Sequence, residues 1–317
     1  MEKKNFRYTN PNQFFKEFGS SKMPSLLPKA TRTKDGAYPA QNFFSIMRIE
    51  EFSKHIKFPL PPGRSTVYEF CWLKKGEMRR TDALTKYLIS AGSICFYASG
   101  NIKSYEYCSE DAEGYYVLFD KDFVLQFLKH PTSIDAFPYF QEDGNPMIKL
   151  MEKDNQEVKR FLEKIEEEHL GDEVDKHRMI GLMLLQLMVA MKRLAVMLTD
   201  TKTNTATEIL THRFMQAIKQ HVLQQRSISF YAGLLNISPN HLNKCVKETT
   251  GKPASEHVSD MIMLEAKVML KQTNYNISEI AVILGFENIS YFTRVFRKNN
   301  GVTPKHYREN FIYPVVE

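Results

Sequence analysis

The spacing of apolar residues divides the chain into three regions. Between about residues 40 and 120, short runs rich in β-branched and aromatic residues alternate with turn clusters such as Pro59 to Gly63 and Glu113-Gly114. Several short strands between turn signals are typical of a small barrel or sandwich. We predict strands at 43–49, 67–73, 86–89, 92–97 and 115–119. The first forty residues are polar and turn-rich, and we expect them to form an arm or an edge.

The second region, from about residue 152 to 198, has a helical pattern. In its first part Val158, Leu162 and Ile165 recur at spacings of three and four, and Gly171-Asp172 interrupts the pattern. Its second part, from about Asp175 to Leu198, is apolar on most sides, so this helix must be buried on more than one side. Two helices joined by a short turn form a helical hairpin. A second copy of the chain would cover the surplus apolar face, and burial within one subunit would serve equally well.

A polar, threonine-rich stretch follows the hairpin and has no apolar period. We interpret it as a flexible linker. The sequence therefore predicts a division into residues 1–150, a helical hairpin at 151–199, a linker at 200–209 and a C-terminal domain at 210–317.

The third region contains one pattern twice. Aligning Ile228 with Ile277 places Ala232 on Ala281 and Leu235 on Leu284, and after a turn Leu242 aligns with Phe292, Val246 with Phe296 and Gly251 with Gly301. A small residue where two helices approach, an apolar spine and a terminal glycine describe a helix-turn-helix unit. We expect Ser238 and Asn288 to cap the second helix of each unit, and Gly251 and Gly301 to end it.

A long helix is predicted between the two units, from Pro253 to Lys271. A rigid connector of this kind would hold the two units at a fixed distance. One chain could then place two recognition helices in successive major grooves, about 34 Å apart on one face of B-DNA.

Residues 210–312 resemble the DNA-binding region of the AraC/XylS family of bacterial transcription regulators. The resemblance lies in Ile280-Ala281-x-x-Leu284-Gly285-Phe286, followed by Tyr291-Phe292-x-Arg294-x-Phe296-Arg297 and by Gly301-x-Thr303-Pro304-x-x-Tyr307-Arg308. The N-terminal region resembles the family's regulatory half more loosely, which is a cupin-like barrel followed by helices that dimerise. The resemblance implies an α+β, multidomain protein in which a cupin-like β-barrel with a helical hairpin precedes an all-α tandem helix-turn-helix domain.

The resemblance also implies which residues face the DNA. The base-contact candidates are Asn240, His241, Asn243 and Lys244 in the first unit and Ile289, Ser290, Thr293 and Arg294 in the second. Their chemistry suits this role, because asparagine can pair with adenine, lysine or arginine with guanine, and isoleucine or threonine with the thymine methyl group. For each of them the alternative is an ordinary solvent-exposed helix residue. The phosphate-contact candidates are Lys247, Arg297, Lys298 and Lys305.

The distribution of charge supports this interpretation. Residues 209–317 carry 13 of the 43 lysines and arginines but only 8 of the 37 aspartates and glutamates, so most of the net charge of +6 lies there. A DNA-binding surface needs such an excess.

Several other classes of protein find little support in the sequence. The four cysteines show no C-x-x-C spacing and fit a reducing compartment, and no secretory signal follows Met1. The apolar run from Met179 to Met191 is too short to span a bilayer, so we expect a cytoplasmic protein without a membrane partner. Residues 1–150 contain only His55 and His130, which leaves no metal-ligand cluster, and we predict no catalytic residue, metal or cofactor.

The expected partners are double-stranded promoter DNA, RNA polymerase, a second copy of the chain and a small-molecule effector. Tyr68, Phe70 and Trp72 share one face of a predicted strand and could line the barrel, but such a stripe is more often core, so we name no effector residue. We expect transcription regulation, with activation favoured. The competing hypothesis is a metal-independent cupin-like binding protein or isomerase in which DNA binding is secondary.

Overall fold

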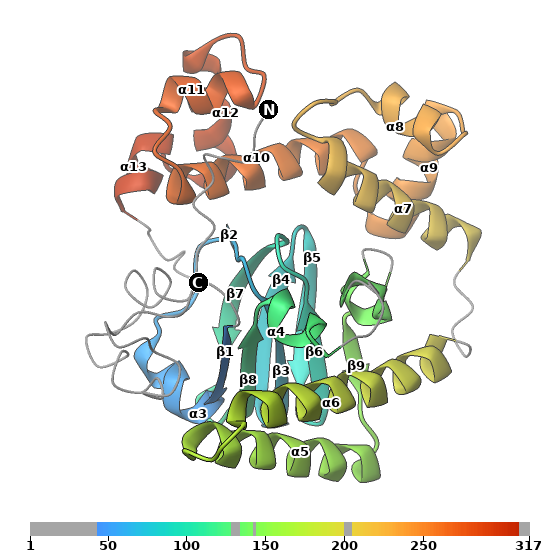
Figure 1. Cartoon of the computed structure of the whole chain (residues 1–317). Coiled ribbons are helices and arrows are strands. Elements are labelled where there is room, and N and C mark those ends of the chain that lie inside the picture. Colours follow the sequence, from blue (N-terminus) through green and yellow to red (C-terminus); the bar gives the residue numbers. More distant parts are fainter. Residues whose placement is uncertain (1–42, 128–133, 142–143, 200–204, 311–317) are drawn as a thin grey trace.

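The computed structural model describes residues 43–127, 134–141, 144–199 and 205–310. A β-rich domain carries a helical hairpin along one side, and a domain made only of helices lies across its opposite end (Figure 1). The predicted α+β, multidomain class is confirmed. The predicted arm in the first forty residues lies outside the described part of the chain.

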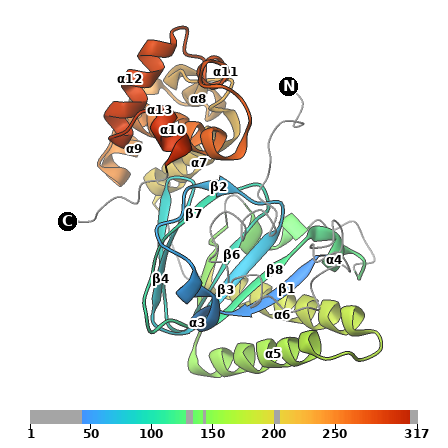
Figure 2. The same cartoon turned by 90° about the vertical axis from the view of Figure 1, so that its left-hand side faces the viewer.

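The strands form two antiparallel sheets that face each other (Figure 2). One has the order β1-β8-β3-β6-β9 and the other the order β2-β7-β4-β5. Within the described residues the two sheets are not joined by hydrogen bonds into a closed barrel, so the sandwich arrangement is the one observed. The strands are β1 (Phe44–Arg48), β2 (Gly63–Arg64), β3 (Tyr68–Lys75), β4 (Glu77–Asp82), β5 (Thr85–Ser90), β6 (Ser93–Tyr97), β7 (Ile102–Cys108), β8 (Glu113–Phe119) and β9 (Met147–Lys149).

The aromatic stripe on β3 faces away from the interior of the sandwich. Phe70 and Trp72 belong to the core between the five-stranded sheet and the hairpin, and Trp72 Nε1 donates a hydrogen bond to Asn155 Oδ1 at 2.8 Å. The alternate residues Cys71 and Leu73 face the second sheet instead. A period of two identifies the faces of a strand but does not say which face is inside the barrel. The stripe is therefore part of the core, as the sequence analysis favoured, and it does not line the interior between the sheets.

The interior between the sheets contains a buried charged cluster, which we call the Glu69 cluster. Glu69 is 2% exposed, and its carboxylate forms ion pairs with Arg80 Nη2 at 2.5 Å and with Lys103 Nζ at 2.7 Å. The hydroxyl groups of Tyr105 and Tyr116 also donate to this carboxylate. Burial alone would raise the pKa of Glu69, but Lys103 and Arg80 hold the pKa at about 2.

Two strands that the sequence did not predict, β4 and β7, contribute charged residues to this cluster. Arg80 lies on β4 and Lys103 on β7, and both side chains point into the interior although they are charged. An alternating pattern with charged residues at its inward positions resembles a solvent-exposed segment. The short strands β2 and β9 were also missed.

The hairpin consists of α5 (Glu152–Leu170) and α6 (Lys176–Thr199), as predicted. Val158, Leu162 and Ile165 of α5 are buried, and Leu184 and Met188 of α6 pack on the same core. The helix α6 has nearly the predicted bounds. The expectation that its apolar stretch is too short to span a bilayer is corrected, because the part from Lys176 to Met197 is long and apolar enough by length and composition; the core helix of a soluble protein passes the same test. Short helices precede the hairpin, namely α3 (Ile49–Phe52), η3 (Ser53–His55), α4 (Lys121–Leu125), η4 (Ile134–Ala136) and η5 (Pro138–Phe140).

The C-terminal domain begins earlier than expected. Thr205 caps the first helix, and Thr205 and Glu208 form a capping box in which each side chain binds the other residue's backbone N–H. The second half of the predicted linker is therefore helical. The helices are α7 (Ala206–His221), α8 (Ile228–Leu234), α9 (Pro239–Thr250), α10 (Ala254–Gln272), α11 (Ile277–Ile283), α12 (Ile289–Asn300) and α13 (Pro304–Glu309).

The two domains contact each other through polar groups around α10. Arg64 of β2 makes a two-pronged ion pair with Glu265 of α10, at 2.6 and 2.9 Å. The Gln272 carboxamide pairs with the backbone N–H and C=O of Arg64, at 2.8 and 2.9 Å. Lys219 of α7 also lies 3.2 Å from Asp82 of β4. The β-rich domain therefore touches the helix that connects the two helix-turn-helix units.

Candidate nucleic-acid interface

The first helix-turn-helix unit consists of α8 and α9. Ser227 caps α8, and the Ser238 hydroxyl accepts a hydrogen bond from His241 N at 3.2 Å at the start of α9. Ala232 and Leu242 are fully buried where the two helices cross. Gly251 ends α9 with φ +77°, the left-handed conformation that glycine adopts without strain. These features agree with the sequence prediction.

The second unit repeats this construction with α11 and α12. Asn276 and Glu279 form a capping box at α11, and Asn288 Oδ1 accepts hydrogen bonds from Ser290 N and Tyr291 N at the start of α12. Buried Ala281 lies at the helix crossing, and Gly301 ends α12 with φ +75°. The core is aromatic: Phe292 packs between Phe286 and Phe296, and Phe296 packs against Tyr307.

The outer face of α9 presents the polar residues predicted for the first unit. Asn240, Asn243, Lys244 and Lys247 are exposed, and their spacing of three, four and seven places them on one side of the helix. The Lys244 side chain is 72% exposed and has Glu248 at 3.9 Å. His241 is also exposed, but its ring lies beside the Cys245 thiol, at the flank of this face.

Asn243 has a second role that the sequence did not indicate. Its side-chain Oδ1 accepts a hydrogen bond from Ala254 N at 3.0 Å, at the first turn of α10. A two-bond pairing with adenine needs both the oxygen and the amide group of an asparagine. In this conformation the oxygen already accepts one hydrogen bond, so a two-bond base contact by Asn243 would have to share that oxygen or break its bond to Ala254.

The candidates of the second unit lie together on α12. All four base-contact candidates line one shallow hollow with Arg297 and Lys298, namely Ile289, Ser290, Thr293 and Arg294. Thr293 is half-buried and the other three are exposed. The Arg294 guanidinium lies 5.3 Å from the centre of the Tyr291 ring. Tyr291 is 51% exposed and was not among the predicted site residues, although it lies one turn before Arg294 in the same sequence motif.

The phosphate-contact candidates lie on or beside these two faces. Lys247, Arg297 and Lys298 are exposed on the recognition helices, and Lys305 is exposed on α13 with Glu309 at 4.0 Å. The two units lie at opposite ends of α10 (Figure 1). The structure therefore provides two separate polar and basic surfaces on one connector, while the individual base and phosphate contacts stay predictions.

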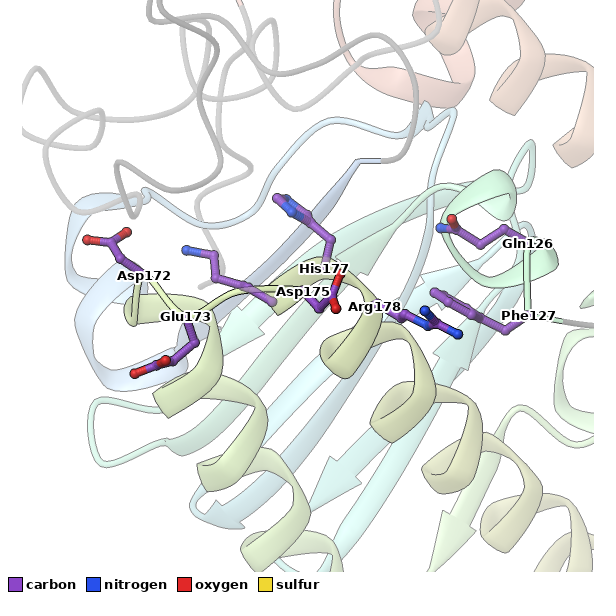
Figure 3. A pocket seen from close by; sticks show the side chains of 8 residues that line it. Gln126, Phe127, Asp172, Glu173, Asp175, His177 and Arg178 are labelled. Carbon is purple, nitrogen blue, oxygen red and sulfur yellow. The ribbon is translucent and has the colours of Figure 1, made fainter.

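A hollow at the tip of the hairpin offers no comparable arrangement. It lies between the end of α4 and the start of α6, and its acidic and basic side chains point in different directions rather than toward one point (Figure 3). Phe127 packs directly over Gly181, where a Cβ atom would lie only 1.9 Å from the ring. Among the described residues, no group of three or more His, Cys, Asp or Glu side chains is placed to hold a metal ion.

Comparison with known proteins places the C-terminal region among helix-turn-helix domains. A family described as "Helix-turn-helix domain" matches residues 231–310. The uncharacterized HTH-type transcriptional regulator YobQ of Bacillus subtilis is 33% identical over 96 residues, which are 30% of this chain and 39% of that protein. The chain thus spans about two fifths of YobQ.

Two relatives match over longer stretches. The uncharacterized HTH-type transcriptional regulator YisR of Bacillus subtilis is 21% identical over 252 residues, which are 77% of this chain and 86% of that protein. The HTH-type transcriptional activator RhaS of Salmonella paratyphi A is 22% identical over 227 residues, which are 70% of this chain and 78% of that protein. The similarity thus extends beyond the helix-turn-helix region into the β-rich domain.

Proposed function

We propose that the protein is a sequence-specific DNA-binding transcription regulator of the AraC/XylS type, because its C-terminal region matches a helix-turn-helix family and carries the motif that resembles the AraC/XylS family. The observation that carries the proposal is the pair of exposed polar and basic surfaces, on α9 and α12, at the two ends of one continuous helix. Each surface suits a major groove, and α10 holds both in one chain.

Activation of transcription is the effect we propose, through contact with RNA polymerase. It is supported by the relative RhaS, which is named a transcriptional activator. We further propose that the protein acts in the cytoplasm and that its β-rich domain regulates DNA binding rather than catalysing a reaction.

A small-molecule effector is proposed as the signal for the β-rich domain. The support is a small cleft between this domain and α7, about 40 Å³ in volume, with Phe96, Tyr139 and Phe140 on one side and Gln216 and Lys219 on the other; it would have to widen to admit a molecule larger than water. Aromatic rings combined with a few polar groups are typical of small-molecule sites. Occupancy of such a hollow would bear on both domains, because both contribute to its wall.

A homodimer formed through α6 is the proposed assembly. Leu182, Val189 and Val196 are 47%, 37% and 47% exposed and recur every seven residues, with Met179 beside them at 50%. A stripe with this period suits the seam between two packed helices. A Leu182→Glu exchange should turn the dimer of the full-length chain into a monomer in sedimentation, whereas Lys164→Glu at an exposed position of α5 should not. A parent chain that is monomeric at high concentration would contradict this assembly.

The DNA-binding proposal is tested with full-length protein and a random-sequence DNA pool. The protein should enrich a defined sequence, and binding to that sequence should weaken linearly in log affinity against log salt. Lys244→Ala and Arg294→Ala should each weaken specific binding by about 1–3 kcal/mol. Failure to enrich any sequence would contradict the proposed function, and unchanged binding by either variant would contradict that residue's contact.

A further inference from the structure

Arg226 forms a direct contact between the two helix-turn-helix units. It lies in the loop between α7 and α8, which leads into the first unit. Its Nη1 atom donates a hydrogen bond to the carbonyl oxygen of Gly285 at 3.2 Å, and its guanidinium carbon lies 5.3 Å from the centre of the Phe286 ring. Gly285 and Phe286 form the turn between α11 and α12. The units are therefore joined here as well as through α10.

The turn of the second unit is shaped to receive this arginine. Gly285 has φ +63°, a left-handed conformation that favours glycine. A Cβ atom on Gly285 would lie 2.5 Å from Arg226 Nη2, which is closer than non-bonded atoms approach. Glycine is thus required for the backbone conformation and also for the close approach of the guanidinium.

Arg226 crosses a groove between the units. The floor of this groove is α10, including Val258 and Ile262, and one wall is the second unit, including Tyr291 and Val295. The helix α10 fixes the distance between the units. The second unit packs on α10 through a shared apolar core, and Arg226 adds a contact to this unit from the side of the first unit, across the groove.

The chemistry of the contact suits arginine specifically. Partial burial lowers the pKa of Arg226, so the group is partly withdrawn from water. A planar guanidinium can donate to a carbonyl while one of its faces rests on an aromatic ring, whereas a lysine ammonium is a compact point charge.

We propose that Arg226 is a positioning residue that fixes the angle between α9 and α12, so that the protein accepts two half-sites at only one spacing. The proposal rests on the proposed function, because it concerns how the two recognition helices reach DNA together. Arg226 would act on the orientation of α12 through the turn that contains Gly285, because this turn leads directly into α12.

The first experiment uses the full-length chain and the duplex that the parent enriches from a random-sequence pool. Base pairs are inserted or deleted, one or two at a time, between the two conserved halves of that duplex. In the parent, affinity should fall steeply away from the selected spacing. In Arg226→Ala this discrimination should fall about tenfold, the effect of losing one hydrogen bond from a charged group, and Arg226→Lys should restore only part of it.

Arg213→Ala is the matched control. Arg213 is exposed on α7 of the same domain, so its loss removes the same charge without touching the second unit. This variant should discriminate between spacings as the parent does. If Arg226→Ala weakens binding equally at every spacing and lowers the salt dependence, Arg226 contacts phosphate instead, and the proposal is overturned. Unchanged spacing discrimination in Arg226→Ala also overturns it.

A second experiment does not depend on DNA. Spin labels are attached at Glu248→Cys on α9 and Asn299→Cys on α12, because both positions are exposed. The background carries Cys108→Ser, because the other three cysteines are buried and Cys108 is only partly buried. The distance distribution between the labels should be narrow in the parent and broader in Arg226→Ala. Equal widths would overturn the proposal. If the parent enriches no DNA sequence but Arg226→Ala broadens the distribution, the proposed function fails while the bracing contact stands.

Discussion

Replacing Glu69 by glutamine tests whether the Glu69 cluster stabilises the β-rich domain. The exchange keeps the shape of the side chain but removes its charge. The charged partner of two buried cations would then be lost. Arg80 is fully buried and Lys103 is 6% exposed, and both form ion pairs with the Glu69 carboxylate. A buried cation without a charged partner destabilises the folded state, because neither water nor a carboxylate then compensates its charge.

The expected magnitude follows from two arguments. Removing one partner of a buried ion pair costs about 3–5 kcal/mol. A pKa of Glu69 lowered from 4.5 to about 2 corresponds to about 3 kcal/mol of preference for the ionised form in the folded state. The free energy of unfolding of a natural domain is about 5–15 kcal/mol, so a loss of about 3 kcal/mol would be a large fraction of the total.

The measurement is urea unfolding followed by the fluorescence of Trp72, the only tryptophan of the chain, which lies on β3 of the same domain. Glu69→Gln should shift the unfolding midpoint strongly to lower urea, and adding Lys103→Met should recover part of the loss. The control is Glu113→Gln, which breaks a surface pair with Lys74 and should leave the midpoint unchanged. A Glu69→Gln midpoint equal to that of the control would refute the reasoning.

Three further predictions concern other contacts. Burial lowers the pKa of His169 from 6.5 to about 4, so the neutral ring contributes fully to stability above pH 6.5 and this contribution is lost as the pH falls toward 4. His169→Phe should therefore remove about 3 kcal/mol of the loss of stability in acid, measured by unfolding curves at a series of pH values. A pH profile equal to that of the parent would contradict this prediction. Thr205→Ala should remove the capping box and destabilise the start of α7 by about 1 kcal/mol, seen as faster amide exchange in its first turn and not in α9. Glu265→Gln should loosen the contact with Arg64, so that amide exchange rises in β2 and α10; protection equal to the parent would show that the Gln272 pairing suffices.

The helix-turn-helix units were predictable because their signals are local. A cap, a small residue at the helix crossing and a glycine after the second helix each act within a few residues, and Ser238, Ala232 and Gly251 occupy these positions in the structure. The α10 connector was predicted from Pro253 to Lys271 and spans Ala254–Gln272 for the same reason.

The β-rich domain was less predictable because its pairing is not local. The inward direction of Arg80 and Lys103 depends on Glu69, which lies on a strand of the opposite sheet. The face on which Trp72 packs depends on the hairpin, about eighty residues later in the chain. The early start of α7 was a different kind of miss, because the Thr205–Glu208 capping box is visible in the sequence but stands inside a stretch that has the composition of a linker.

The DNA-facing candidates illustrate the same limit. The resemblance to the AraC/XylS family was enough to name Lys244 and Arg294, and the structure shows both on exposed faces. Periodicity could not reveal that the guanidinium of Arg226 meets Gly285, because this contact joins residues fifty-nine positions apart.

The hydrogen bond between Asn243 and Ala254 has a consequence for how such a protein could acquire new target genes. The same side chain is a candidate for reading a base and also holds the first turn of the central helix. An exchange at this position that suited another base would at the same time unfasten that turn, unless the new residue were also short and carried an oxygen. Aspartate and serine meet this condition and most other residues do not, so drift in sequence preference is narrower at this site than at the neighbouring Lys244.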